Sequence, residues 1–495
     1  MNDLFFRGKL NLLWPFGLIL TLGLFLTACS PPRGTGLTES SAPLSESFPT
    51  PAAEFTPLPT RPYYQPGELV EYIAQTGDTL PALAVRFNTT EAQIRAANEI
   101  IPPDATTMPP GFPMQIPIYY QALWGTPYQI LPDTLYVNGP AQVGFDTTAF
   151  IDGHPGWLRT YTEGGLEGRQ TAAQIIERVA TNFSVSPRLL LAMLEYQSQA
   201  LSSPSLPDTT FFLGYQNQNY RGLYLQLVWA ANTLNNGYYG WRGGTMREFD
   251  SPDRRLQRPD PWQNAASVAL QYFYSRLYNT PIYDQIIGPG GLAQTYDALF
   301  GDPWDVEPHL PGSLRQPDFL LPFERGQSWN YTGGPHTGWG LGEPFAAIDF
   351  APVGVSDCNI STAWITAVAD GLVIRSETGI VVLDLDGDGN EGTGWVIFYL
   401  HVAAENRARV GQFLSAGGYI GHPSCEGGSS TGTHVHLARK YNGEWILADG
   451  PLAFNLEGWV SARGARAYQG TLTRLGQTVA ASTRAEARSV IQAGE

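Results

Sequence analysis

The chain has 495 residues, of which 12% are aromatic, so several domains with sizeable cores are expected. Its 45 acidic residues outnumber the 29 basic residues and give a formal charge of −16. No basic run is long enough to follow a phosphate backbone, which argues against nucleic acid or anionic lipid headgroups as the main ligand.

The N-terminal segment predicts export from the cytoplasm. Arg7 and Lys9 precede an apolar run that ends in the sequence LTAC, as in a secretory signal, so residues 1–28 are interpreted as a signal peptide. The LTAC ending resembles a lipobox, which implies lipid on Cys29 and a membrane-anchored lipoprotein of the bacterial cell envelope. An uncleaved anchor helix is the alternative, because the apolar run approaches the length that spans a bilayer.

A small domain at residues 67–119 follows a linker at 29–66, which is rich in Pro, Ser, Thr and Gly and is expected to be disordered. The domain's pattern predicts a strand, two helices and a strand, in the segments VEYIAQTGDTL, PALAVRFN, EAQIRAAN and GFPMQIPI. This order resembles a LysM module, which implies binding to glycan that contains N-acetylglucosamine. The implied glycan-binding residues are Gly77, Asp78, Thr79, Leu80, Pro81 and Asn98. A small fold that serves only as a spacer is the alternative.

Residues 136–308 are predicted to form an all-α domain. Four segments have helical patterns: TAAQIIERVATNF, SPRLLLAMLEYQSQAL, GLYLQLVWAANTLNN and WQNAASVALQYFYSRLY. The region faintly resembles a degenerate lysozyme-like domain, with Gln197 and Ser198 where the catalytic Glu-Ser would fall. An amide cannot protonate a glycosidic oxygen, and Glu195 lies about 200° away around the helix. A silent glycan-binding domain and a plain helical spacer both stay open.

Residues 320–460 change to strand patterns, such as GIVVLDLD and TGWVIFYLHV, and predict an antiparallel sheet. The fold class expected for the whole chain is therefore multidomain α+β. The final residues, 461–495, have no clear core pattern, and no structure is predicted for them.

Histidines gather in this last domain, in the segments GGPH, FYLH and THVH, and an aspartate lies in AAIDFAP. His434 and His436 are two residues apart in an extended run, so their rings should lie on one face of a strand. Neutral imidazole and carboxylate are zinc ligands, and a hydrolase keeps one position for water. The candidate set is His336, Asp349 and His436 as ligands of one Zn²⁺, with His401 and His434 for proton transfer.

The order and spacing of these residues resemble the lysostaphin–staphylolysin zinc metallopeptidases, also called the LytM type. The usual HxGID pattern is altered here, because Phe345 stands four residues before Asp349 and His336 stands thirteen before it. That long spacing resembles the staphylolysin branch. The resemblance implies the ligand set and the catalytic pair above, without dividing the roles of His401 and His434.

Two further features belong to this region. Cys358 and Cys425 predict a disulfide in an exported chain, with two free thiols as the alternative. Asp384 to Asp388 resemble the first half of a calcium loop, but the twelfth position holds Trp395, so an Asp- and Gly-rich hairpin turn is the alternative to a Ca²⁺ site.

These features together predict an envelope lipoprotein that hydrolyses peptide bonds in the stem peptides or cross-bridges of peptidoglycan. The LysM module would hold the glycan and the zinc site the peptide. The alternative is a non-catalytic regulator, a LytM-type activator of cell-wall amidases. An adhesin with a structural zinc is less compatible, because such a site is usually closed by four protein ligands.

Overall fold

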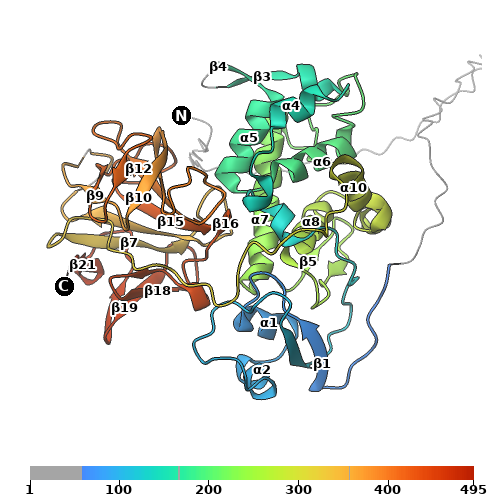
Figure 1. Cartoon of the computed structure of the whole chain (residues 1–495), viewed down its shortest axis with the longest axis horizontal. Helices are drawn as coiled ribbons and strands as arrows, with labels where there is room; N and C mark the ends of the chain where they lie inside the picture. The colour runs from blue at the N-terminus through green and yellow to red at the C-terminus, as the bar shows by residue number, and fades with distance from the viewer. Residues whose placement is uncertain (1–57, 166–167, 356, 360, 495) are drawn as a thin grey trace, which may run out of the picture. The chain divides into compact units, whose positions relative to one another are not determined.

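The computed structural model of the chain describes residues 58–165, 168–355, 357–359 and 361–494. The predicted signal peptide, Cys29 and the linker before residue 58 lie outside the described residues. None of the helices that the structure describes is long and apolar enough to cross a membrane. The described chain contains a small β–α–α–β module, a group of helices and a large antiparallel sheet, which confirms the α+β class (Figure 1).

The first module has the predicted order of elements. They are β1 (Glu68–Ile73), α1 (Leu80–Arg86), α2 (Glu91–Ala97) and β2 (Pro113–Ile118). The two strands pair antiparallel. Thr79 and Thr90 cap the two helices by accepting hydrogen bonds from backbone N–H groups of the first turns.

The middle region is helical, as predicted. Its α-helices are α3 (Asp133–Tyr136), α4 (Thr147–Asp152), α5 (Ala172–Phe183), α6 (Pro187–Ser198), α7 (Leu223–Arg242), α8 (Ala265–Ser275), α9 (Thr280–Ile286) and α10 (Gln294–Phe300). Two short hairpins accompany them, β3 (Thr162–Gly165) with β4 (Gly168–Thr171) and β5 (Phe249–Asp250) with β6 (Leu256–Gln257). A capping box between Thr171 and Gln174 begins α5, and Ser186 with Pro187 begins α6. The four predicted helices correspond to α5, α6, α7 and α8.

The large sheet has the strand order β13-β10-β11-β12-β15-β8-β7-β21, and β16 pairs with β15. Its strands are β7 (Ser328–His336), β8 (Ala347–Pro352), β10 (Gly371–Glu377), β11 (Gly379–Asp384), β12 (Trp395–Val402), β13 (Phe413–Leu414), β15 (Val435–Tyr441), β16 (Glu444–Trp445) and β21 (Val490–Gln492). All the pairings are antiparallel.

Side chains of this sheet alternate between two faces, each with its own core. Ile397 and Leu437 belong to a core on one face. Phe398 and Ala438 point to the other face and share a core with residues of α5 and α7. His436 lies between Val435 and Leu437 in β15, so it is on the face that the helices cover.

A buried ionic cluster joins the helices to the sheet. Arg242, the last residue of α7, lies 2.9 Å from the carboxylate of Glu444 in β16 and 3.1 Å from that of Asp133. His309 Nε2 lies 2.7 Å from Glu444, and the Tyr238 hydroxyl donates to the same carboxylate. Because buried charges are costly unless they are paired, this cluster stabilises only the assembled arrangement of helices and sheet.

The C-terminal residues form strands that no sequence pattern predicted. They contribute to a small sheet of β17 (Asn455–Leu456), β18 (Trp459–Arg463), β19 (Gly470–Arg474) and β20 (Gln477–Ala480), and β21 pairs with β7 at the edge of the large sheet. A further short pair joins β9 (Ile365–Thr366) and β14 (Tyr419–Gly421).

Candidate metal centre

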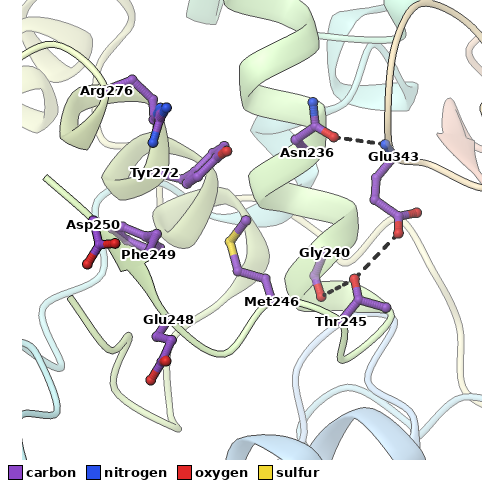
Figure 2. A pocket seen from close by; sticks show the side chains of 10 residues that line it. All are labelled: Asn236, Gly240, Thr245, Met246, Glu248, Phe249, Asp250, Tyr272, Arg276 and Glu343. Carbon is purple, nitrogen blue, oxygen red and sulfur yellow. Dashed lines mark hydrogen bonds between the residues drawn. The ribbon is translucent and has the colours of Figure 1, made fainter. Parts of the chain in front are cut away.

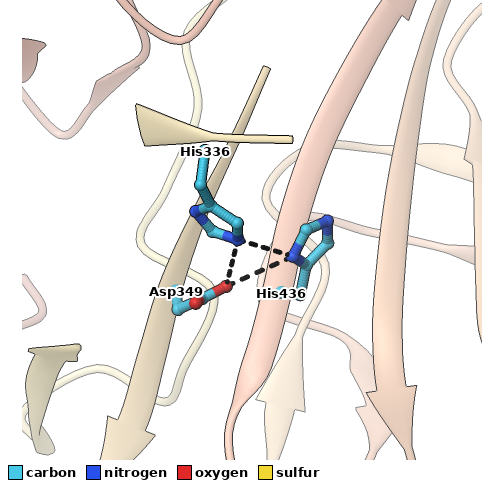
Figure 3. Close-up of side chains that lie close together, drawn as sticks. All are labelled: His336, Asp349 and His436. Carbon is cyan, nitrogen blue, oxygen red and sulfur yellow. Dashed lines mark hydrogen bonds and ion pairs between the residues drawn. The ribbon is translucent and has the colours of Figure 1, made fainter. Parts of the chain in front are cut away.

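Three adjacent strands bring the predicted ligands together. His336 ends β7, Asp349 lies in the middle of β8, and His436 follows the first residue of β15. His436 stands directly opposite Asp349 in the register of β15 and β8. Figure 3 shows the two rings and the carboxylate converging on one point.

The converging atoms are very close to one another. His336 Nε2 lies 3.0 Å from His436 Nδ1, and Asp349 Oδ1 lies 3.2 Å from the first and 3.3 Å from the second. All three residues are buried, with at most 6% of each residue exposed. One ligand atom from each therefore meets the others in a space sheltered from bulk water.

Backbone carbonyls fix which ring nitrogens carry protons. His336 Nδ1 lies 2.8 Å from Gly334 O, and His436 Nε2 lies 3.1 Å from Gly338 O. A carbonyl oxygen only accepts, so each of these nitrogens is the donor, and in neutral rings the nitrogens facing the centre carry lone pairs.

The donor set fits a metal cation. Two imidazole lone pairs and a carboxylate oxygen face one another, and Asp349 Oδ1 is buried without a hydrogen-bond partner. Burial lowers the pKa of His436, which keeps this ring neutral. Burial would raise the pKa of Asp349, but the imidazoles of His336 and His434 outweigh it and hold that pKa well below its usual range. The arrangement is unfavourable unless a cation lies between the three atoms, and one carboxylate with two imidazoles suits zinc.

A β-bulge directs His401 to the same centre. The pairing of β11 with β12 shifts between Gly379 and Ile380, which leaves His401 as an extra residue with a φ of 67°. Regular alternation would send His401 to the face opposite Leu400, and the bulge redirects it. Its ring centroid lies 4.5 Å from that of His434 and 6.4 Å from that of His436.

The rings of His401 and His434 are oriented by backbone carbonyls, as the rings of the candidate ligands His336 and His436 are. His401 Nδ1 lies 2.8 Å from Glu426 O, and His434 Nδ1 lies 2.8 Å from Gly432 O. The Nε2 atom of His434 is 3.8 Å from Asp349 Oδ1. Burial, with His434 and His436 nearby, lowers the pKa of His401 to about 3, so this ring is a neutral base over the physiological range.

The glycines of GGPH allow the close approach of β7. A Cβ atom on Gly333 would lie 2.3 Å from Asp349 Oδ2, and one on Gly334 would lie 2.4 Å from the backbone of Gln469. The register of β7 with β8 also shifts between Gly333 and His336. These irregularities let a histidine at the end of β7 reach Asp349 despite the long spacing in sequence.

Tyr468 borders the centre and was not predicted from the sequence. Its ring stacks on that of His336 with centroids 4.1 Å apart, and Gly334 N donates to Tyr468 O. Burial, with Asp349 nearby, raises the pKa of Tyr468. Tyr468 lies beyond the segment with recognisable strand patterns, so no signal in the sequence pointed to it.

Helix α7 contacts the segment between β7 and β8, residues 337–346. Asn232 Oδ1 accepts from Leu341 N at 2.7 Å, and Asn236 Oδ1 accepts from Glu343 N at 2.9 Å. Asn236 Nδ2 also donates to Leu341 O. Figure 2 shows Asn236 and Glu343 at a pocket of about 360 Å³ beside this contact. The helices therefore hold the segment that carries the carbonyl partner of His436, Gly338.

The predicted disulfide is present. Cys358 and Cys425 are bonded, with their Cα atoms 5.5 Å apart. Thr433 N donates to Asp357 O next to this bridge, so the bridge ties the loop before β9 to the approach of His434.

The predicted calcium loop has the features of a hairpin turn. Asp384, Asp386 and Asp388 have carboxylate oxygens within 4.8 Å of one another. The Asp384 carboxylate accepts from the N–H groups of Asp386 and Gly389 in its own turn. Beyond this acidic cluster nothing supports Ca²⁺, which stays a prediction.

Three of the predicted glycan-binding side chains point into the module's own interior. The Asp78 carboxylate bonds to Tyr72 and Arg86, and the Asn98 amide bonds to Ile94 O and Gln115 O. Leu80 is 2% exposed. These side chains have partners within the module, and glycan binding at these loops stays a prediction.

In the middle region, the structure gives the partners of Gln197 and Glu195, while the prediction that this domain lacks a catalytic acid stays a prediction. Gln197 Oε1 accepts from the Tyr278 hydroxyl, and the Glu195 carboxylate accepts from Leu201 N and Ser202 N just after α6. Both side chains therefore have ordinary structural partners.

Known proteins resemble this chain over most of its length. Residues 129–313 match the family model described as LasA, N-terminal domain, and residues 72–117 match that of the LysM domain. Protease LasA of Pseudomonas aeruginosa is 25% identical over 338 residues, which cover 65% of this chain and 75% of that protein.

The peptidase region has relatives of its own. The beta-lytic metalloendopeptidase of Lysobacter enzymogenes is 30% identical over 143 residues, which cover 27% of this chain and 76% of that protein. Among solved structures, the match to the M23 metalloprotease pseudoalterin covers 34% of this chain and 96% of the pseudoalterin chain. The sequence identity is 23% and the TM-score is 0.29.

Proposed function

The chain belongs to the family of M23 metalloendopeptidases that includes protease LasA and the beta-lytic enzymes, and on that premise we propose that it cleaves peptide bonds in the stem peptides or cross-bridges of peptidoglycan. The observation that carries the proposal is the meeting of two imidazole lone pairs and a buried carboxylate oxygen within 3.3 Å of one another. Two further histidines of the same face stand beside them.

In this proposal His336 Nε2, Asp349 Oδ1 and His436 Nδ1 hold one zinc ion. When bound, zinc polarises a carbonyl group and lowers the pKa of a water molecule towards neutrality. The carbonyls of Gly334 and Gly338 keep both ligand rings oriented, as outer-shell partners of metal ligands commonly do.

His401 and His434 would carry out the proton transfers. Each donates from Nδ1 to a backbone carbonyl, so each keeps Nε2 free as a base. One ring would take the proton of the attacking water on its Nε2 and deliver it to the leaving amine, and the other would stabilise charge on the carbonyl oxygen only in the form that carries a proton on Nε2. The division of the two roles is left open.

The remaining assignments concern location. We propose export, followed by lipid anchoring through Cys29, on the signal-like N-terminus and its LTAC ending. The Cys358–Cys425 bridge agrees with an oxidising compartment outside the cytoplasm. The LysM module would bind the glycan strands of peptidoglycan and so hold this substrate beside the peptidase region of the same chain.

A non-catalytic regulator is the competing function. Such a protein needs neither zinc nor a proton-transfer pair, and this chain keeps all three candidate ligands, His401 and His434 in one place. That completeness favours the enzyme.

The test is digestion of purified peptidoglycan, with new amino groups measured by chemical labelling. We expect release by the wild-type chain and a loss of about a hundredfold or more in His434→Ala, with zinc retained. His422→Ala is the matched control, because the buried His422 ring donates to Ala363 O and packs on Trp364. Equal release by His434→Ala would contradict the proposed role, and no release by any form would favour the regulator.

A further inference from the structure

A segment of the chain lies across the LysM module. Residues 310–315 connect the helical region to the large sheet, and they contact both loops of the module. On the first loop, Thr76 Oγ1 accepts from Leu310 N at 3.1 Å. On the second loop, Thr107 Oγ1 accepts from Leu314 N at 3.0 Å and donates to Pro311 O at 2.8 Å.

Further hydrogen bonds extend this contact. Ser313 N donates to Thr107 O at 2.8 Å, and Thr106 Oγ1 donates to Leu314 O at 2.6 Å. The Arg315 guanidinium pairs with the carboxylate of Asp104. The segment therefore uses its backbone N–H and C=O groups, while the module supplies threonine hydroxyls and its own backbone.

The fit is tight on both sides. A Cβ atom on Gly312 would lie 2.6 Å from Pro109 Cα, and one on Gly77 would lie 2.9 Å from Leu310 Cδ1. Leu310 and Leu314 are 2% and 6% exposed. The segment is packed between the two loops and excludes any other ligand from the same place.

The chemistry of this surface indicates what else would bind there. Hydroxyl and amide groups on two facing loops recognise secondary amides, and an N-acetylated sugar carries the same N–H and C=O pair in its acetamido group. We propose that residues 310–315 occupy, in cis, the surface by which the LysM module takes N-acetylated glycan, so that glycan binding and docking of this segment exclude each other. This inference rests on the glycan partner in the proposed function.

Docking of the segment also links the module to the peptidase sheet. Leu310 and Leu314 pack with Trp395 of β12 and with Ile446, and the neighbouring His309 pairs with Glu444 of β16. Glycan that displaces the segment must separate these side chains from their partners. By linkage, the apparent association constant for glycan equals the intrinsic constant multiplied by the fraction of molecules that are undocked, so stable docking weakens glycan binding.

Gly312→Ala in the full chain tests the proposal. The methyl group meets Pro109 and weakens docking, while every group of the two loops is kept. We expect the affinity for the hexamer of N-acetylglucosamine, measured by titration calorimetry, to rise about tenfold or more. Gly164→Ala is the matched control, because a Cβ atom at Gly164 meets no atom within 4 Å. Equal affinity of the wild-type chain and both variants, or no binding by any of them, would overturn the proposal.

A second measurement uses the wild-type chain and does not depend on how the variant folds. Saturating hexamer should speed hydrogen exchange at the amides of Leu310, Ser313 and Leu314, because their hydrogen bonds to the module are lost. Binding of the hexamer with unchanged exchange at these amides would also overturn the proposal. Neither measurement involves zinc or peptide cleavage, so failure here is distinct from failure of the peptidase assignment.

Discussion

At the scale of single residues, backbone carbonyls arrange the chemistry of the centre. Gly334, Gly338, Glu426 and Gly432 each accept a hydrogen bond from one ring nitrogen of a histidine, and the second nitrogen of each ring is left for the centre. Because the tautomer is fixed by a rigid acceptor, the site needs little reorganisation when a cation binds.

Gly333→Ala should weaken zinc binding without touching a ligand. The added methyl group would lie 2.3 Å from Asp349 Oδ2 and must displace the carboxylate. We expect zinc affinity to fall about tenfold to a hundredfold, as when outer-shell groups are changed. Competition with a chelating dye measures this affinity, and the same change at the open site Gly164 provides the comparison. Unchanged zinc affinity in Gly333→Ala would contradict the expectation that the position of the Asp349 carboxylate controls zinc binding.

The convergence of the three candidate ligands could be predicted from the sequence, and their surroundings could not. Histidines in GGPH and THVH, together with Asp349, have residue types and spacings that indicate zinc. Tyr468 and the four carbonyls have no such pattern, because a stacked ring or a backbone oxygen becomes a partner only through tertiary packing. The hydrogen bonds of the Asp78 and Asn98 side chains within the LysM module could not be predicted for the same reason.

At the scale of elements, irregular pairing places the side chains. The bulge at His401 and the shifts in β7 turn two histidines towards Asp349. The strands of the sheet were predictable from alternation, whereas a bulge depends on pairing between distant segments and leaves no local signal. The C-terminal strands were also missed, since short strands with few large aliphatic residues depend on their neighbours.

Loss of the disulfide should weaken the fold near His434. Cys358 and Cys425 are separated by 67 residues in sequence. A double change to serine is expected to lower the free energy of unfolding by about 2–4 kcal/mol, because the unfolded chain regains the freedom of that loop. Urea unfolding of the two proteins measures the difference. No difference would mean that the bridge adds no stability to the native chain.

Asn236→Ala should loosen the segment between β7 and β8. The change removes the bonds to Glu343 N and Leu341 O and is expected to cost about 1–3 kcal/mol. Hydrogen exchange at Glu343 and Leu341 should become faster. Thr233→Ala is the control, because Thr233 Oγ1 bonds to Trp229 O within α7. Equal exchange in both variants would argue against this contact.

At the scale of the whole molecule, the buried ionic cluster around Glu444 joins the helices to the sheet. Burial would raise the pKa of Glu444, but Arg242 and His309 outweigh it and lower this pKa from 4.5 to about 2. A lowered carboxylate pKa contributes stability above the unfolded value of 4.5, and that stability is lost as the pH falls towards 2. The contact between helices and sheet should therefore weaken in acid.

Glu444→Gln tests that dependence. At neutral pH we expect the free energy of unfolding to fall by about 3 kcal/mol, since Arg242 keeps only Asp133 as an anionic partner. Near pH 2 the difference from the wild-type chain should shrink, because Glu444 is then about half protonated in the folded chain and almost fully protonated in the unfolded chain. Glu248→Gln, at an exposed pair with Arg258, should change stability by less than about 1 kcal/mol. A loss that is the same at both pH values would contradict the electrostatic explanation.

The zinc content of the folded chain decides whether the metal centre exists. We expect about one zinc per folded wild-type chain, measured by atomic emission after extensive dialysis, and loss of that zinc in His336→Ala. His422→Ala should keep it. A folded wild-type chain without zinc, or full zinc in His336→Ala, would contradict the claim that His336, Asp349 and His436 form the metal centre.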